Sequence, residues 1–153
     1  MSRLQRKVQF VLGLEDPPAK IARGFAIGMF VAASPFWGFH SLLALGLAIL
    51  VRGNTAAAIA AAWTSNPLTA PPLYALCYLL GMKVLGRSGD AIDWSSFSMS
   101  SEGFHYLLGH LSDLLIPLIT GCTIVGAVIG ALSYYLMLRA VKRWRRPPAP
   151  VEA

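Results

Sequence analysis

The sequence predicts an all-α integral membrane protein, built from two proline-broken helical hairpins, re-entrant or discontinuous, and a C-terminal transmembrane helix. Apolar residues make up 56% of the chain and the mean hydropathy is +0.58, which is more hydrophobic surface than one soluble core of this size can bury. Charged residues are 13% of the chain, about half the usual share in soluble domains. Prolines interrupt the apolar runs at matching places, Pro35 and Pro67.

The basic residues gather at the two ends of the chain. Residues 1–15 carry Arg3, Arg6 and Lys7 on one side and apolar side chains at helical spacing on another, which predicts a basic amphipathic helix on the membrane surface. Residues 139–153 are expected to form a basic tail with a disordered end. Basic flanks favour cytoplasmic termini. The net charge of +6 does not point to nucleic acid, because no basic patch is interleaved with stacking aromatics.

The membrane domain is expected to cover residues 16–140, and its first hairpin is 17–52. Asp16 is a capping residue followed by two prolines, which is typical of a helix start. Pro35 stops or kinks this helix. The hairpin closes at Arg52-Gly53, a basic residue and a C-terminal glycine.

The second hairpin is expected at 54–87. Asn54 or Thr55 can cap an alanine-rich helix that runs through Trp63. The break covers residues 65–72, with three prolines, and the run after it closes at Gly86-Arg87.

Length decides how the four half-segments are interpreted. Crossing the hydrocarbon takes about 20 helical residues, and none of the four reaches that length. Each pair is too long for one ordinary crossing and short for two, which is typical of re-entrant or discontinuous helices. Residues 88–103 are expected to form a polar loop and 104–138 a helix and span, in which 114–138 carries no charge and is long enough to cross alone.

The two breaks form the predicted binding site. An interrupted helix in a bilayer leaves backbone groups unpaired, and this is tolerated only against protein, water or ligand. The positive ends of the half-helices can face an anionic group. The alternative is that the prolines only shape turns at the membrane surface and the arginines only reach lipid headgroups. The candidate substrate-binding residues are Arg23, Ser34, Pro35, His40, Arg52, Ser65, Asn66, Pro67 and Thr69.

Two glycine pairs at four-residue spacing allow helices to approach closely, within the protein or between copies. One pair is Gly24 and Gly28; the other is Gly126 and Gly130, which is the predicted oligomer interface.

Other chemistry is not expected. Cys77 and Cys122 lie far apart in apolar runs, so they are interpreted as small buried hydrophobes and not as a disulfide or metal pair. His110 and Asp113 share one face of a helix, but His105 lies off that face. A third ligand at helical spacing is therefore missing, and no metal is expected. With no nucleotide loop, nucleophile elbow or paired carboxylates, neither an enzyme nor a cofactor is predicted.

Three stretches resemble a known bacterial membrane family, domain of unknown function 2062. They are residues 24–28, 34–40 and, above all, 63–74, where the run Asn-Pro-Leu-Thr-Ala-Pro-Pro is the most specific part. The resemblance covers roughly residues 19 to 140. It implies a protein of the bacterial inner membrane, sometimes fused to glycosyltransferase domains in related chains, and no established activity.

The leading functional hypothesis is a small multi-pass inner-membrane transporter or flippase-like protein for an anionic or amphipathic substrate, such as a lipid-linked phosphate. The expected partners are membrane lipids and further copies of the chain. The rival hypothesis is a non-catalytic scaffold that docks a cell-envelope enzyme through the basic termini and the glycine-lined helix.

Overall fold

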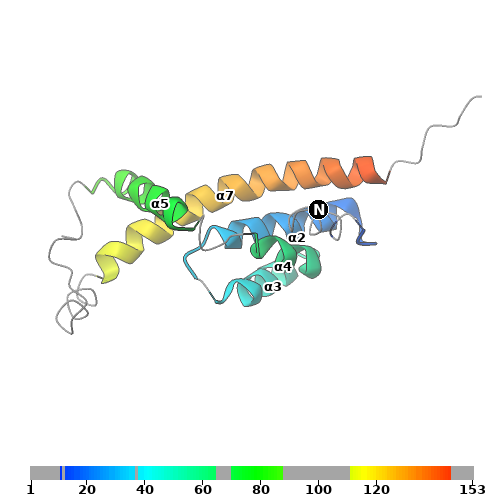
Figure 1. Ribbon diagram of the computed structural model, residues 1–153, viewed down its shortest axis with the longest axis horizontal. Helices are drawn as coiled ribbons and strands as arrows, with labels where there is room; N and C mark the ends of the chain where they lie inside the picture. Colours follow the sequence, from blue (N-terminus) through cyan, green and yellow to red (C-terminus); the bar gives the residue numbers. More distant parts are fainter. Residues whose placement is uncertain (1–10, 12, 37, 65–69, 88–110, 146–153) are drawn as a thin grey trace, which may run out of the picture. The chain divides into compact units, whose positions relative to one another are not determined.

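The computed structural model describes residue 11 and residues 13–36, 38–64, 70–87 and 111–145. These residues form α-helices joined by turns, which confirms the predicted all-α class (Figure 1). The five helices are α2 Pro18–Ala32, α3 His40–Leu50, α4 Thr55–Ala62, α5 Ala70–Val84 and α7 Leu111–Trp144.

The chain divides into two compact units. The first contains α2, α3, α4 and the part of α7 from Gly126 onward; the second contains residues 33–35, α5 and α7 up to Val125. The helix that the sequence assigns to the start of the second hairpin, α4, packs against α2 and α3. Re-entrant geometry of the two hairpins stays a prediction.

The predicted start of α2 at the two prolines is confirmed, but the Asp16 carboxylate, expected to cap the helix, accepts from Lys20 Nζ and Asn54 Nδ2. The helix also ends before Ser34, the expected last residue. The first helical residue is Pro18, and the carbonyl of Pro17 accepts the backbone N–H groups of Lys20 and Ile21. The helix ends at Ala32, before Pro35, because the residue preceding a proline is disfavoured in the helical conformation. The break then extends to the start of α3 at His40.

Asn54 caps α4, as one of the two alternatives predicted. Its side-chain oxygen accepts the backbone N–H of Ala57 at 2.7 Å, which satisfies one of the N–H groups that a helix start leaves without an intrahelical partner.

Helices α3 and α5 end in the same way. In both, the backbone N–H two residues beyond the C-cap donates to the carbonyl five positions earlier: Gly53 to Ala48 at 2.7 Å, and Arg87 to Met82 at 3.0 Å. This is the Schellman motif, whose left-handed residue is usually glycine. Gly86 fills that position in α5 with φ 64°, but in α3 it is Arg52, with φ 53°, and not Gly53.

Helices α2 and α4 touch backbone to backbone. A Cβ atom added to Gly24 would lie 2.0 Å from the carbonyl oxygen of Asn54, and one added to Gly28 would lie 2.1 Å from that of Ala58. The facing side of α4 is alanine. The Gly24/Gly28 pair therefore works within the protein, which is one of the two uses that the sequence allows.

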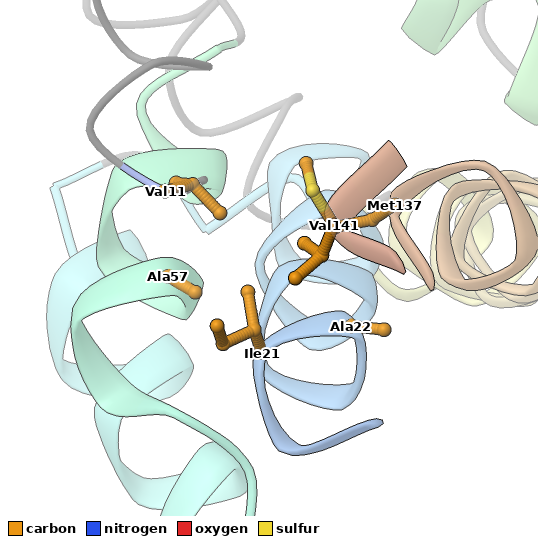
Figure 2. Packing of buried hydrophobic residues seen from close by; sticks show 6 residues of the cluster. All are labelled: Val11, Ile21, Ala22, Ala57, Met137 and Val141. Carbon is orange, nitrogen blue, oxygen red and sulfur yellow. The ribbon is translucent and has the colours of Figure 1, made fainter. Parts of the chain in front are cut away.

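The core of the first unit is made of small and branched side chains from three helices. Figure 2 shows side chains of α2, α4 and α7 converging together with Val11. This cluster comprises Val11, Ile21, Ala22, Ala57, Met137 and Val141. A second cluster joins α2 to α3 and α4.

In the second unit, α5 lies against the first part of α7. A Cβ on Gly81 would lie 1.8 Å from the Pro117 carbonyl oxygen, and one on Gly121 would lie 1.7 Å from that of Cys77. The Arg87 guanidinium and the Asp113 carboxylate form an exposed ion pair at 3.3 Å. Glycine again permits helices to meet at backbone distance.

Helix α7 is the one described helix that is long and apolar enough to cross a membrane. It runs for 34 residues from Leu111 to Trp144, and an 18-residue stretch of it has a mean hydropathy of 2.2. It contains the uncharged segment that the sequence singled out. Pro117 lies inside it, and the hydroxyls of Thr120 and Thr123 each donate to the carbonyl four residues earlier at 2.8 Å.

Several predictions fall on residues outside the described ranges. They are the surface helix over most of 1–15, the second break at 65–69, the loop 88–103 with His105 and His110 beyond it, and the end of the tail from 146.

The α2–α4 contact predicts opposite effects for two glycines in helices. Gly24→Ala forces α2 and α4 apart and should lower the free energy of unfolding by about 1–3 kcal/mol or more. Gly46→Ala, in α3, meets nothing within 4 Å and should raise it by up to about 1 kcal/mol, because alanine favours the helix. Thermal unfolding in detergent micelles measures both, and equal effects of the two substitutions would contradict the backbone contact.

Candidate functional site

The candidate site is an open groove in the first unit, with a cavity volume of about 360 Å³. One wall comes from α2 and the other from α7, and Val51, at the start of the turn between α3 and α4, also lines it. The lining residues are Arg23, Ala26, Ile27, Val51, Gly130, Ala131, Tyr134 and Tyr135.

Small residues set the width of the groove. Gly130 lies against α2, where an added Cβ would be 3.2 Å from the Ala26 carbonyl oxygen. One turn earlier, a Cβ on Gly126 would be 3.1 Å from the carbonyl oxygen of Phe30. The two helices are therefore close at these glycines, and the bulkier Tyr134 and Tyr135 follow along α7.

Arg23 is the one charged side chain among the described residues that line this groove. It is exposed, and within the described part of the chain it has no acidic or hydrogen-bonding partner. The rings of Tyr134 and Tyr135 meet edge to face, 5.8 Å apart. The groove thus offers an apolar surface with a cation, a combination that suits an amphiphile with an anionic head.

Arg52 lies in the turn between α3 and α4. Its neighbour Val51 is a lining residue, and its other neighbour, Gly53, touches the α2 backbone: an added Cβ would be 2.8 Å from Gly24 N and 3.3 Å from Arg23 C. Gly53 is therefore required for close approach and not for a left-handed φ. The backbone of this turn thus rests on α2 at Arg23 and Gly24, and the exposed Arg52 precedes Gly53 in it.

A polar network holds this turn against α2. The Asp16 carboxylate accepts from Lys20 Nζ at 2.9 Å and from Asn54 Nδ2 at 2.6 Å. The backbone N–H of Asn54 also donates to the Lys20 carbonyl at 2.9 Å. The hydrogen bond from Lys20, followed by that from Asn54, lowers the pKa of Asp16 below its usual value. Asn54 thus caps α4 and fastens the turn at the same time.

Of the nine predicted site residues, Arg23 lines the groove, and Arg52 lies in the turn whose backbone at Gly53 contacts α2 at Arg23. His40 is the first residue of α3. Ser34 and Pro35 belong to the second unit, where the Tyr74 hydroxyl donates to the Ser34 carbonyl at 2.9 Å. The remaining four lie outside the described residues: Ser65, Asn66, Pro67 and Thr69.

The two glycines of the predicted oligomer interface pack against α2 of the same molecule. Gly126 and Gly130 are buried and lie against Phe30 and Ala26 of the same molecule. An interface between copies through these glycines stays a prediction.

Sequence reasoning missed most of the groove. Tyr134 and Tyr135 stand near the end of the uncharged run of α7, where interfacial aromatics are common, and that position was an available signal. Val51 carries no such signal, because it is one apolar residue among many. The pairing of Asp16 with Asn54 bridges 38 positions and has no sequence pattern.

These observations define an all-α protein with a long apolar helix and an arginine-bearing apolar groove beside it. A family model matches residues 1–148, and the chain therefore belongs to the family DUF2062, described as an uncharacterized protein conserved in bacteria. No curated protein and no solved structure matches the chain. The family resemblance expected from the motifs is confirmed.

The left-handed Arg52 predicts opposite changes in stability for two substitutions at equivalent positions of α3 and α5. An L-residue with a side chain costs about 1–2 kcal/mol in this conformation, so Arg52→Gly should raise the free energy of unfolding by about 1 kcal/mol. Gly86→Ala, at the equivalent position of α5, should lower it by a similar amount. Chemical denaturation in micelles measures both, and a destabilised Arg52→Gly protein would show that the Arg52 side chain itself holds the turn.

The lowered pKa of Asp16 predicts a loss of stability in acid. A carboxyl whose pKa is lower in the folded protein stabilises the fold above its unfolded pKa, about 3.9 for aspartate. That contribution is lost as the pH falls through the folded pKa. The thermal midpoint should therefore drop between about pH 5 and about pH 3, and the drop should be smaller in Asp16→Asn. Identical pH profiles for the two proteins would exclude Asp16 as the responsible group.

Proposed function

We propose that this protein is a small inner-membrane transporter of the flippase type, which binds an anionic amphiphile such as a lipid phosphate in the groove between α2 and α7. The observation that supports the proposal is the composition of that groove: apolar and aromatic side chains line its walls together with Arg23, and Arg52 follows the lining residue Val51 in the chain.

The two ends of an amphiphile match the two parts of the groove. A guanidinium presents a planar fork of donors that binds a phosphate with two parallel hydrogen bonds. No acidic side chain is among the described lining residues, so neither arginine has to exchange a carboxylate partner for the ligand there. The hydrocarbon part of the ligand can lie along Ile27, Val51 and the tyrosine rings.

The distribution of apolar side chains supports a membrane location for more than α7. Large hydrophobic side chains are exposed on α3, on α5 and along α7, and in water such surfaces would lead to aggregation. In a bilayer they face lipid. The proposal therefore places α3 and α5 in the membrane together with the span, in a multi-pass arrangement.

The position of the groove on α7 indicates the leaflet from which the ligand enters. Tyr134 and Tyr135 lie near the end of the uncharged segment, and the basic stretch begins one turn later at Arg139. Aromatic and basic residues in that order are typical of the cytoplasmic interface. A lipid bound with its phosphate at Arg23 would come from the cytoplasmic leaflet.

Reconstitution into liposomes tests this function. Movement of a fluorescent anionic phospholipid between leaflets should be faster with the wild-type protein than in protein-free vesicles, and Arg23→Gln should reduce the rate at least about tenfold, the loss expected when one charge-assisted hydrogen-bond partner is removed. Arg143→Gln is the matched control, because it removes an exposed arginine of α7 that does not line the groove; it should retain the wild-type rate.

Two outcomes would overturn the proposal. Equal movement of anionic and zwitterionic lipids in all three proteins would show that the groove does not select an anion. Absence of any protein-dependent movement, with a cell-envelope enzyme recovered in equal amount by mild crosslinking, would favour the scaffold hypothesis instead.

A further inference from the structure

Two buried thiols meet at the contact between α5 and α7. Cys77 is 0% exposed and Cys122 is 3% exposed, and their side chains are neighbours. Both are free cysteines. The burial of each confirms its interpretation as a small buried residue, but their adjacency was not predicted, because they are far apart in the sequence.

The backbone geometry explains why the thiols are adjacent. Gly121 precedes Cys122, and a Cβ on Gly121 would lie 1.7 Å from the carbonyl oxygen of Cys77 and 3.0 Å from its Cα. The second glycine contact, of Gly81 with Pro117, lies one turn away on each helix and holds the same close approach. With the two backbones in contact, the short cysteine side chains have little room to separate.

We propose that Cys77 and Cys122 form a reversible intramolecular disulfide that joins α5 to α7 when the protein meets a peroxide. The proposal does not depend on the lipid-binding groove, which is built from the first unit. The alternative is a purely structural role, in which both sulfurs only fill space between the helices. The two alternatives differ in the product of oxidation, because a thiol beside an oxidised cysteine captures it.

The reaction balances with hydrogen peroxide as the oxidant. One thiol gives up its proton as its sulfur attacks a peroxide oxygen; the O–O bond breaks, a sulfenic acid forms, and the departing hydroxide takes up that proton to become water. The second sulfur then attacks the sulfenic sulfur, the S–O bond breaks, and a second water leaves. Two thiols and one peroxide give one disulfide and two waters. A dithiol reductant reverses the change.

Burial determines which oxidant fits. A bulky, charged disulfide such as oxidised glutathione cannot reach two sulfurs that are almost fully covered, whereas hydrogen peroxide is small and uncharged. Reactive cysteines are normally exposed, so the reaction here is slow and the pair stays reduced at low peroxide. Because sulfenic acid forms next to a thiol, it is trapped before further oxidation.

The test uses the full-length protein in lipid nanodiscs, treated with hydrogen peroxide and then with a thiol-alkylating reagent. The intact mass should fall by two hydrogens, with neither cysteine alkylated, and dithiothreitol should restore two alkylatable thiols. A site-specific protease sequence inserted between residues 95 and 96 gives a second measurement. After cleavage the two fragments should migrate together without reductant and separately with it.

A matched variant keeps the number of cysteines but separates them. Cys77→Ser combined with Ala75→Cys moves the α5 thiol to an exposed position, and it should form no intramolecular crosslink. Its remaining cysteines should accumulate sulfinic acid. Sulfinic acids in place of a disulfide in the wild type would overturn the proposal, and so would a crosslink that forms only between two copies. These two overturning results are measured on proteins that keep Cys77 and Cys122, so they do not depend on how the variant folds.

Discussion

Backbone-to-backbone contact between helices is the constraint on which the described structure depends. Without a large hydrophobic difference between lipid and side chains, helices in a membrane associate through close packing, and small residues permit it. In the first unit this contact occurs at Gly24 and Gly28 against α4, and in the second at Gly81 and Gly121. Large apolar side chains are correspondingly free to point outward, and many of them do.

The candidate groove follows from the same constraint. Because Gly53 has no side chain, the turn after α3 rests on the α2 backbone at Arg23 and Gly24. The hydrogen bonds among Asp16, Lys20 and Asn54 hold it there. Arg52 accepts an unfavourable left-handed conformation in this turn. A strained residue that is not glycine points to a role for its side chain.

The sequence predicted the local features of the fold well. The start of α2 at the second of two prolines, the cap at Asn54 and the uncharged segment of α7 each depend on a few neighbouring residues, and each is present. The close-approach role of Gly24 and Gly28 was one of two stated alternatives. The sequence did not reveal that Arg52, and not Gly53, takes the left-handed conformation, because a glycine in the C-terminal turn can serve either a positive φ or close approach.

Hydropathy, spacing and capping residues by themselves determined that the chain is helical, where most of its helices start and stop, and that one segment can cross a bilayer. These properties are local, since they arise from hydrogen bonds and side chains within a turn or two. Only the tertiary structure decided that Arg23 meets the Arg52 turn, that tyrosines of α7 line the same groove, and that Cys77 meets Cys122. Each of these joins residues distant in the chain, and the packing of small residues between helices selects them.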